Sequence, residues 1–210
     1  MAPRVLIVVA RQFNGHELWC TLHVLNKYNI EYEVISTQQV ITDEVTFESV
    51  RIKRTIDDVD VEEVNSFNGL MIISGNMKDT EAYWKHQKVL SYVRQNQPKP
   101  TAAICCSVPT IREAARKKRV SFFPLVRSRL LLEQAGAICV NVTITVDGNL
   151  VTAENQMGTE VWAECFASLL LGQEPQLGLT ETTFRPKARK SRKTPPEITR
   201  LREQALRQTQ

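Results

Sequence analysis

Two adjacent cysteines stand where the sequence most clearly positions a reactive group. The apolar residues 101–104 run directly into Cys105 and Cys106, and a helical pattern follows. A strand that turns sharply into a helix, with a nucleophile at the junction, is the layout of a nucleophile elbow. Such a turn needs small residues two positions before and two positions after the nucleophile. Ala103 and Ser107 meet this need for Cys105, whereas Cys106 would have isoleucine and valine there, so Cys105 is the predicted reactive thiol.

The position of this thiol predicts its chemistry. Unpaired N–H groups and a partial positive charge at a helix N-terminus stabilise a thiolate, so we expect a lowered pKa for Cys105. The reactive thiol would attack an electrophilic carbon. Cys106 is either a second thiol that resolves an oxidised Cys105 or a packing residue, and the packing role is favoured because adjacent cysteines close only a strained ring.

Alternating strands and helices must position this turn. The hydrophobic patterning predicts strands at 4–10, 31–36, 70–73, 102–105 and 120–122, hairpins joining 40–47 to 49–56 and 138–146 to 149–153, and helices at 16–28, 80–95, 109–118, 126–135 and 157–171. This order predicts an α/β domain with a mainly parallel, flavodoxin-like sheet sandwiched by helices. Active sites in such sheets lie beyond the carboxyl ends of the strands. Gly75 follows one predicted strand and Cys105 another, so we expect both at this edge.

Composition limits the class of protein. The 210 residues are 42% hydrophobic and 24% charged, as in an ordinary globular protein, which excludes a disordered chain, a coiled coil and a collagen-like repeat. No apolar run approaches the roughly 20 residues of a membrane span. The apolar stretch 4–10 is interpreted as a buried strand and not as a signal peptide. Five cysteines, two of them adjacent, make a poor disulfide framework, and a reducing, cytoplasmic location is expected.

Charge divides the chain into two predicted parts. Residues 182–210 carry nine Lys/Arg and two Glu, a net charge of +7, whereas 1–181 carry a net charge of −3. We therefore predict a domain at 1–172 and a basic, flexible tail at 173–210. The densest basic run, 185–193, could contact nucleic acid or an acidic partner weakly, although a solubilising extension is the favoured interpretation.

Four segments in this order resemble the ThiJ/PfpI superfamily, which includes deglycases and intracellular proteases. Residues 102–105 resemble its nucleophile motif, and Ser74-Gly75-Asn76 resembles its Gly-Gly-Asn loop. Glu17 follows the first strand as the acid of the family does, and 147–153 resembles its final hairpin. The similarity spans residues 4–172 and implies the class I glutamine amidotransferase-like variant of the α/β fold.

The resemblance assigns roles to several residues. Glu17 would support Cys105, either by donating a hydrogen bond to its thiolate when protonated or by acting as general acid and base. The backbone N–H groups of Gly75 and Cys106 would form an oxyanion hole, and Asn76 would contact the substrate. The resemblance implies no metal and no organic cofactor, and it suggests a homodimer.

The sequence departs from the family at a position that matters for catalysis. Many members place a histidine after the elbow, and Phe123 takes that place here. Ser74 and Ser107 replace glycines of the family motifs. Because Phe123 cannot act as the base of a Cys–His pair, the Glu17–Cys105 pair remains as the candidate for catalysis.

A second set of polar residues lies on the first predicted helix. His16, Cys20 and His23 share one helix face, opposite its leucines. A zinc site is conceivable, but a surface or subunit-contact face is favoured, because three ligands from one short helix would be unusual. Cys20, Cys139 and Cys165 are interpreted as inert core thiols.

Arginines near the elbow are candidates for binding an anion. Arg112, Arg127 and Arg129 follow the cysteine turn, and guanidinium groups bind carboxylate or phosphate in a bidentate way. Arg112 and Arg127 are the predicted substrate contacts.

Two functional hypotheses follow. The first is a cysteine-dependent hydrolase, or a stress enzyme of glyoxalase or deglycase type, that acts on small electrophilic carbonyls, amides or peptides. The second is a non-catalytic member that serves as a binding or oligomerisation module, with the basic tail contacting a partner.

Overall fold

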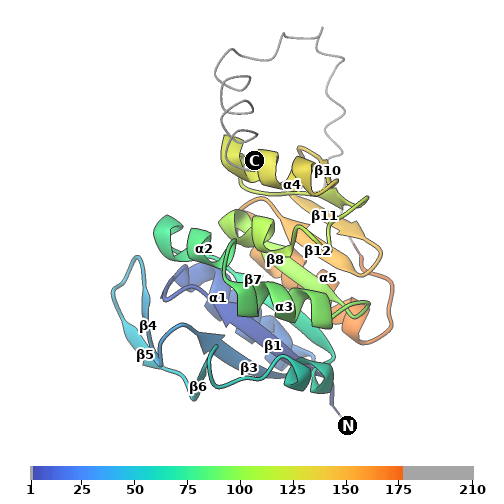
Figure 1. The fold of residues 1–210 in the computed structure, drawn as a ribbon. Helices are drawn as coiled ribbons and strands as arrows, with labels where there is room; N and C mark the ends of the chain where they lie inside the picture. Colours follow the sequence, from blue (N-terminus) through green and yellow to red (C-terminus); the bar gives the residue numbers. More distant parts are fainter. Residues whose placement is uncertain (1, 177–210) are drawn as a thin grey trace, which may run out of the picture.

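A central sheet organises the protein, whose structure is a computed structural model that describes residues 2–176 (Figure 1). Its seven strands lie in the order β11-β12-β8-β7-β1-β3-β6, and only the β11–β12 pair is antiparallel. The strands are β1 (Arg4–Val9), β3 (Glu31–Ser36), β6 (Arg54–Thr55), β7 (Gly69–Ile73), β8 (Thr101–Ile104), β11 (Ile144–Asp147) and β12 (Leu150–Ala153). The predicted α/β fold with a mainly parallel sheet is confirmed. Most of the predicted basic tail, residues 177–210 with the run 185–193, lies outside the described residues.

Helices cover both faces of this sheet. One face carries α1 (Gly15–Lys27) and α5 (Thr159–Leu170), and the other carries α2 (Met77–Tyr83), α3 (Gln87–Gln95) and α4 (Val126–Gln134) (Figure 1). Alternate side chains of β1 enter the two cores: Leu6 and Val8 face one layer, and Val5 and Ile7 face the other. Burial on both faces explains why this strand reads as a continuous apolar run.

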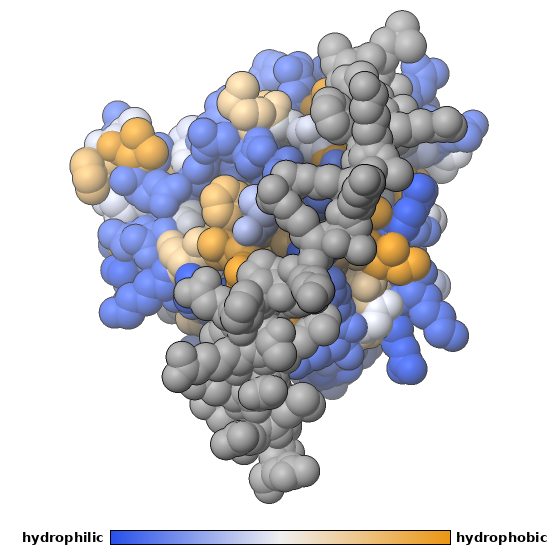
Figure 2. All heavy atoms as spheres, turned by 90° about the horizontal axis from the view of Figure 1, so that it is seen from above, coloured by the Kyte–Doolittle hydropathy of each residue, from blue (hydrophilic) through white to orange (hydrophobic). Residues whose placement is uncertain are grey.

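Two small sheets extend the central one. One contains β2 (Gln12–Phe13), β4 (Val40–Asp43) and β5 (Ser49–Arg51), and the other pairs β9 (Arg119–Val120) with β10 (Ile138–Cys139). The tip of the β4–β5 hairpin exposes Val45 and Phe47, and Figure 2 shows hydrophobic surface on the side of the molecule where this hairpin lies in Figure 1. No helix of residues 2–176 is both long enough and apolar enough to cross a membrane.

The turn residues gave a reliable prediction at the last hairpin. Asp147 pairs with Leu150 across Gly148 and Asn149, so β11 and β12 are joined by a two-residue turn. Gly148 has φ +63°, the left-handed conformation that such a turn requires and that glycine adopts without steric cost.

Two helix predictions were wrong. The expected helix 80–95 is divided into α2 and α3, because the chain turns at Trp84, whose indole is bonded into the neighbouring elbow. The expected helix 109–118 is instead the end of the 3₁₀ helix η2 (Cys105–Ile111) followed by turns. Pro109 lies inside this segment without an N–H to donate, and Lys117 has φ +61°, which ends any helical continuation.

Two predicted strands are also divided. Within 49–56, β5 pairs with β4 as expected, but β6 leaves the hairpin and joins β3 in the central sheet. Within 138–146, β10 pairs with β9, and only β11 reaches the central sheet. Two further 3₁₀ helices complete the fold, η1 (Glu62–Ser66) and η3 (Gln156–Gly158), and η3 takes the first turn of the helix predicted at 157–171.

Candidate active site

Three polar side chains lie at one edge of the sheet, after three neighbouring strands. β8, β7 and β1 are adjacent and parallel. Cys105 follows β8, Ser74 follows β7, and Glu17 lies in the first turn of α1, which follows β1. Because parallel strands share one carboxyl edge, residues far apart in the sequence meet there. The structure thus brings together Cys105 and Glu17, as the sequence predicted, and adds Ser74.

Cys105 lies at the tightest point of the chain around this site. Its φ of +57° places it in the left-handed region, which is unusual for a residue with a side chain. The Ser107 hydroxyl lies 2.7 Å from Ile104 O and 2.8 Å from Ile72 O, and it accepts from Ile104 N at 3.1 Å. The chain therefore bends sharply at Cys105 between β8 and the following 3₁₀ helix, and Ser107 stabilises this bend through hydrogen bonds that a glycine could not form.

The loop after β7 approaches the loop after β1 too closely for a side chain. A Cβ on Gly75 would lie 1.9 Å from Gln12 O, so only glycine fits. Asn14 N donates to Ser74 O at 3.0 Å, and Asn76 N donates to Gln12 O at 2.7 Å. These bonds hold Ser74 against the start of α1.

Glu17 is a buried acid with an incomplete set of partners. Asn14 caps α1 by accepting from Glu17 N at 3.1 Å, which turns the Glu17 side chain inward. The carboxyl group is fully buried, and its Oε2 accepts from Ser74 N at 3.1 Å and from Ser74 Oγ at 2.7 Å. Its Oε1 is buried without a hydrogen-bond partner. Burial, with a smaller contribution from Cys105, raises the pKa of Glu17 from 4.5 to about 8.

The Cys105 thiol differs from the prediction. Its Sγ lies 3.7 Å from Cys106 Sγ, and the contact with this second thiol, followed by burial, raises the pKa of Cys105 above its ordinary value. The Ser74 hydroxyl and the Cys106 backbone N–H oppose this rise only in part. The expected lowering of this pKa was wrong, because the contact with the Cys106 thiol and the burial of the sulfur outweigh the two hydrogen bonds that favour the thiolate.

The predicted oxyanion and substrate groups are largely bonded within the protein. Gly75 N donates to Thr80 Oγ1 at 3.1 Å, so this N–H points at Thr80 and not at a free position beside Cys105. Asn76 caps α2 by accepting from Lys78 N at 3.0 Å. The Cys106 N–H, in contrast, is directed at the Cys105 sulfur.

The two predicted arginine contacts have different surroundings. Arg112 Nη1 donates to Trp84 O at 2.8 Å and to Pro109 O at 3.2 Å, and burial lowers its pKa. Arg112 therefore fastens the elbow to the end of α2. Arg127 lies exposed on α4 and forms an ion pair with Glu81 of α2.

The position after the elbow where many family members have a histidine holds Phe123 in this chain. Phe123 N donates to Cys105 O at 3.4 Å, which puts Phe123 beside the elbow, as the sequence comparison predicted. His16 and His23 are exposed on α1. Within residues 2–176 no group of three or more His, Cys, Asp or Glu side chains could hold a metal ion.

The other cysteines are only partly as predicted. Cys165 is buried in the core, but Cys20 and Cys139 are only partly buried, so these two are not core thiols. Burial raises the pKa of both, and Glu160 and Glu164 of α5 add to the rise at Cys20.

Two supporting residues were missed by the sequence reasoning. The Ser74 hydroxyl binds Glu17, although Ser74 was noted only as a replaced glycine. Trp84 Nε1 donates to Cys106 O at 2.9 Å and fixes the back of the elbow. The position of Ser74 directly after a buried strand could have indicated its role, but no local signal indicated the role of Trp84.

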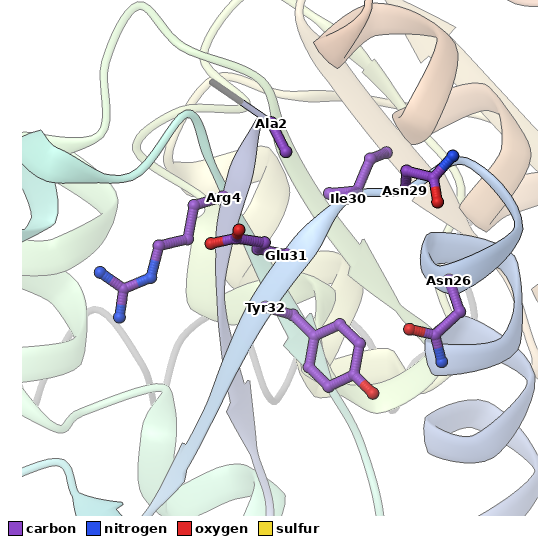
Figure 3. Close-up of a pocket in the computed structure, with 7 residues that line it drawn as sticks. All are labelled: Ala2, Arg4, Asn26, Asn29, Ile30, Glu31 and Tyr32. Carbon is purple, nitrogen blue, oxygen red and sulfur yellow. The ribbon is translucent and has the colours of Figure 1, made fainter.

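Sizeable open pockets lie away from these residues. One, of about 650 Å³, is lined by Ala2, Arg4, Asn26, Asn29, Ile30, Glu31 and Tyr32 at the starts of β1 and β3. Figure 3 shows Tyr32 of β3 facing Asn26 of α1 across this space. These residues lie at the amino edge of the sheet, opposite Cys105.

An elbow cysteine beside a buried acid, on a mainly parallel sheet between helices, defines a class of α/β proteins built around a cysteine at the carboxyl edge of the sheet. The chain belongs to the DJ-1/PfpI family, whose model matches residues 3–168. A deglycase of Pyrococcus horikoshii is 27% identical over 172 residues, which cover 80% of this chain and 99% of the relative.

Solved structures agree with this fold. A ThiJ/PfpI domain protein of Brachyspira murdochii superposes with a TM-score of 0.72 at 16% identity, covering 82% of this chain and 99% of the other. DJ-1beta of Drosophila melanogaster superposes with a TM-score of 0.69 at 19% identity, covering 82% of this chain and 92% of the other. At these identities the likeness concerns the architecture alone.

Proposed function

We propose that this protein is a cysteine-dependent enzyme, a hydrolase or a stress enzyme of glyoxalase or deglycase type, that acts on small electrophilic carbonyls or amides. One observation carries the proposal: a fully buried carboxyl group, Glu17, lies beside a cysteine held in the strained conformation of an elbow. Strained residues and shifted pKa values gather at functional sites, because a merely structural role rarely requires either.

The raised pKa of Glu17 suits proton transfer near neutral pH. With a pKa of about 8, Glu17 is mostly protonated at pH 7, and roughly one-tenth is ionised. The ionised form takes the proton of the Cys105 thiol as its Sγ bonds to the carbonyl carbon. The C=O π bond opens onto the oxygen, and Glu17 returns the proton there. With an aldehyde this addition gives a hemithioacetal, with atoms and charge balanced.

In this mechanism Cys105 is a neutral thiol at rest that Glu17 activates as a base, and not the resting thiolate that the sequence predicted. The elevated pKa of Cys105 leaves little free thiolate at neutral pH, so a neighbouring proton acceptor is needed. The Cys106 N–H can stabilise the oxygen that gains charge. The deglycase relative, at 27% identity, supports a carbonyl-derived substrate class for this chain.

A turnover assay tests the proposal directly. Methylglyoxal and a set of small amide substrates are incubated with the full chain and with Cys105→Ser, with Cys139→Ser as the matched control. We expect Cys105→Ser to lose at least about 100-fold in kcat/KM, and the control to remain within twofold. The wild-type rate should rise with pH towards 8 as Glu17 ionises. Equal turnover by wild type and Cys105→Ser would reject the enzyme for those substrates.

The thiol itself gives an independent measurement. The rate of alkylation of Cys105 by iodoacetamide should rise only at more alkaline pH than for an ordinary cysteine, because the Cys106 contact and burial raise its pKa. A Cys105 that is alkylated fully at pH 6 would contradict both the pKa direction and the role of Glu17 as base.

A second candidate function is supported by the same site. Phe123 lies beside Cys105 where many relatives have a histidine, and Gly75 N–H is bonded to Thr80. These features favour a non-catalytic binding or oligomerisation module, assembled as a homodimer and contacting an acidic partner through the basic run 185–193. Truncation after residue 180 should then weaken salt-dependent binding of DNA or of an acidic protein, and unchanged binding would remove this role for the run.

A further inference from the structure

The geometry of the elbow points to a second property, which does not depend on turnover: we propose that Cys105 and Cys106 form a dithiol binding site for monosubstituted trivalent arsenicals. Both thiols are free, and their sulfurs lie 3.7 Å apart. The proposed reaction at Cys105 does not use the Cys106 thiol.

The bend at Cys105 is what makes the two thiols face one another. Neighbouring side chains point to opposite faces of a strand and do not face each other on a helix. The left-handed φ of +57° at Cys105 departs from both geometries, and it brings consecutive side chains into contact.

The spacing matches that of two sulfurs on one central atom. Two sulfurs bonded at about 2.3 Å to one pyramidal trivalent arsenic, whose S–As–S angle is about 100°, are separated by roughly 3.5 Å. The observed 3.7 Å is close to this value, so the two As–S bonds require only a small closing movement of the two side chains. A preformed pair binds more tightly than a flexible one, because less conformational entropy is lost on binding.

The elbow that carries the pair is held from several sides. Ser107 Oγ bonds to Ile104 and Ile72, and Trp84 Nε1 bonds to Cys106 O. These contacts fix the backbone on both sides of the two thiols. The backbone that carries the two thiols is therefore held in place before any ligand binds.

The number of sulfur donors selects the ligand. A structural zinc ion needs four protein ligands, and no cluster of three or more metal-binding side chains occurs within residues 2–176. An organoarsenical R–As=O needs two thiols only. Its arsenic loses both bonds to oxygen and gains two As–S bonds, while the two thiol protons leave with the oxygen as water. Arsenic stays trivalent, so no oxidant or reductant is required.

Access to the site favours an ordered reaction. Cys105 is partly exposed, whereas Cys106 is only 5% exposed. The arsenical therefore bonds first to Cys105 and closes the ring onto Cys106. Glu17, whose buried Oε1 has no hydrogen-bond partner and whose carboxyl group interacts electrostatically with Cys105, can accept a thiol proton during the exchange.

Phenylarsine oxide is the probe, and the reduced full chain is the sample. We expect one phenylarsine per chain, measured by intact mass, that survives excess 2-mercaptoethanol and is released by ethanedithiol. After denaturation and alkylation, two thiols should be protected, both in the peptide that contains residues 105 and 106. An adduct that 2-mercaptoethanol removes, or protection located elsewhere, would overturn the proposal.

Variants separate the pair from the single thiol. Cys106→Ser should bind phenylarsine oxide at least about 100-fold more weakly, because the second bond is no longer formed within the same molecule. It should still be alkylated at Cys105 by iodoacetamide, which shows that this thiol is available, and its urea denaturation curve should overlay that of wild type, which shows that the fold is intact. Cys20→Ser is the matched control and should bind as wild type does. Undiminished binding by Cys106→Ser, or loss of binding by Cys20→Ser, would contradict the dithiol site.

Discussion

Polar side chains are buried at the carboxyl edge of the central sheet and exposed at its amino edge. At the carboxyl edge, Glu17 and Ser74 are withdrawn from water and hydrogen-bonded to each other. At the amino edge, Glu31 is exposed on an open pocket that it lines with Tyr32. A charge in water is screened, whereas a buried carboxyl group changes its protonation to suit its surroundings. Reactive chemistry is therefore expected at the closed edge and not in the more open pocket.

The largest effect is expected where the two loops of the carboxyl edge touch. Gly75→Ala forces a Cβ against Gln12 O, and the backbone must shift because neither atom belongs to a flexible side chain. We expect a loss of about 3 kcal/mol in the free energy of unfolding. Asn26→Ala, at the exposed amino edge, should change it by less than about 0.5 kcal/mol. Urea denaturation measures both free energies. Similar values for the two variants would contradict the proposal that the carboxyl edge is more sensitive to substitution than the amino edge.

The second prediction concerns the proton on Glu17. Its native pKa of about 8 exceeds the unfolded value of 4.5, so the native state binds more protons between these pH values. The free energy of unfolding therefore falls as pH rises from about 4.5 to 8. Glu17→Gln keeps an acceptor for Ser74 and removes this fall, so at pH 8.5 it should be more stable than wild type by more than about 1 kcal/mol.

The control for this prediction lies at the other edge. Glu31→Gln changes an exposed side chain and should alter the free energy of unfolding at pH 8.5 by less than about 0.5 kcal/mol. Denaturation curves at pH 5, 7 and 8.5 provide the comparison. If Glu17→Gln loses stability at pH 8.5, the carboxyl group is ionised in the native protein, and its role as a proton carrier near neutral pH fails.

The smallest effect is expected from the hydroxyl that closes the elbow. Ser107→Ala removes the bonds to Ile72 O and Ile104 N and leaves buried backbone groups with fewer partners. We expect a loss of about 1–2 kcal/mol in the free energy of unfolding. Tyr32→Phe removes a hydroxyl from the amino-edge pocket and should cost less than about 0.5 kcal/mol. Equal losses of unfolding free energy in Ser107→Ala and Tyr32→Phe would show that the elbow does not depend on the Ser107 hydroxyl.

Short-range patterns predicted the architecture well. The apolar runs at 4–10 and 70–73 became central strands, because a strand buried on both faces must be apolar throughout. The turn at Gly148 was predicted because its conformation is set by the residues of the turn itself. The helix predicted at 109–118 failed because Pro109 and the requirements of the elbow overrode a local periodicity.

Part of the candidate site was predictable because it depends on neighbouring residues in the chain. Ala103 and Ser107 identified Cys105 as the bend, since the steric demand of that turn acts over two residues on either side. The pKa of Cys105 was not predictable. It depends on how close the Cys106 sulfur lies and on how far the pair is buried, and neither follows from spacing along the chain.

The sequence by itself determined the α/β layering, the family and the position of the bend, because each can be recognised from short segments and from their order along the chain. Only the tertiary structure decided that Ser74 would bind Glu17, that Gly75 N–H would turn to Thr80, and that the buried acid would hold its proton near neutral pH. Those outcomes depend on how close the loops after these strands lie to one another and on how far the carboxyl group is kept from water. Both are set when β1, β7 and β8 pair side by side.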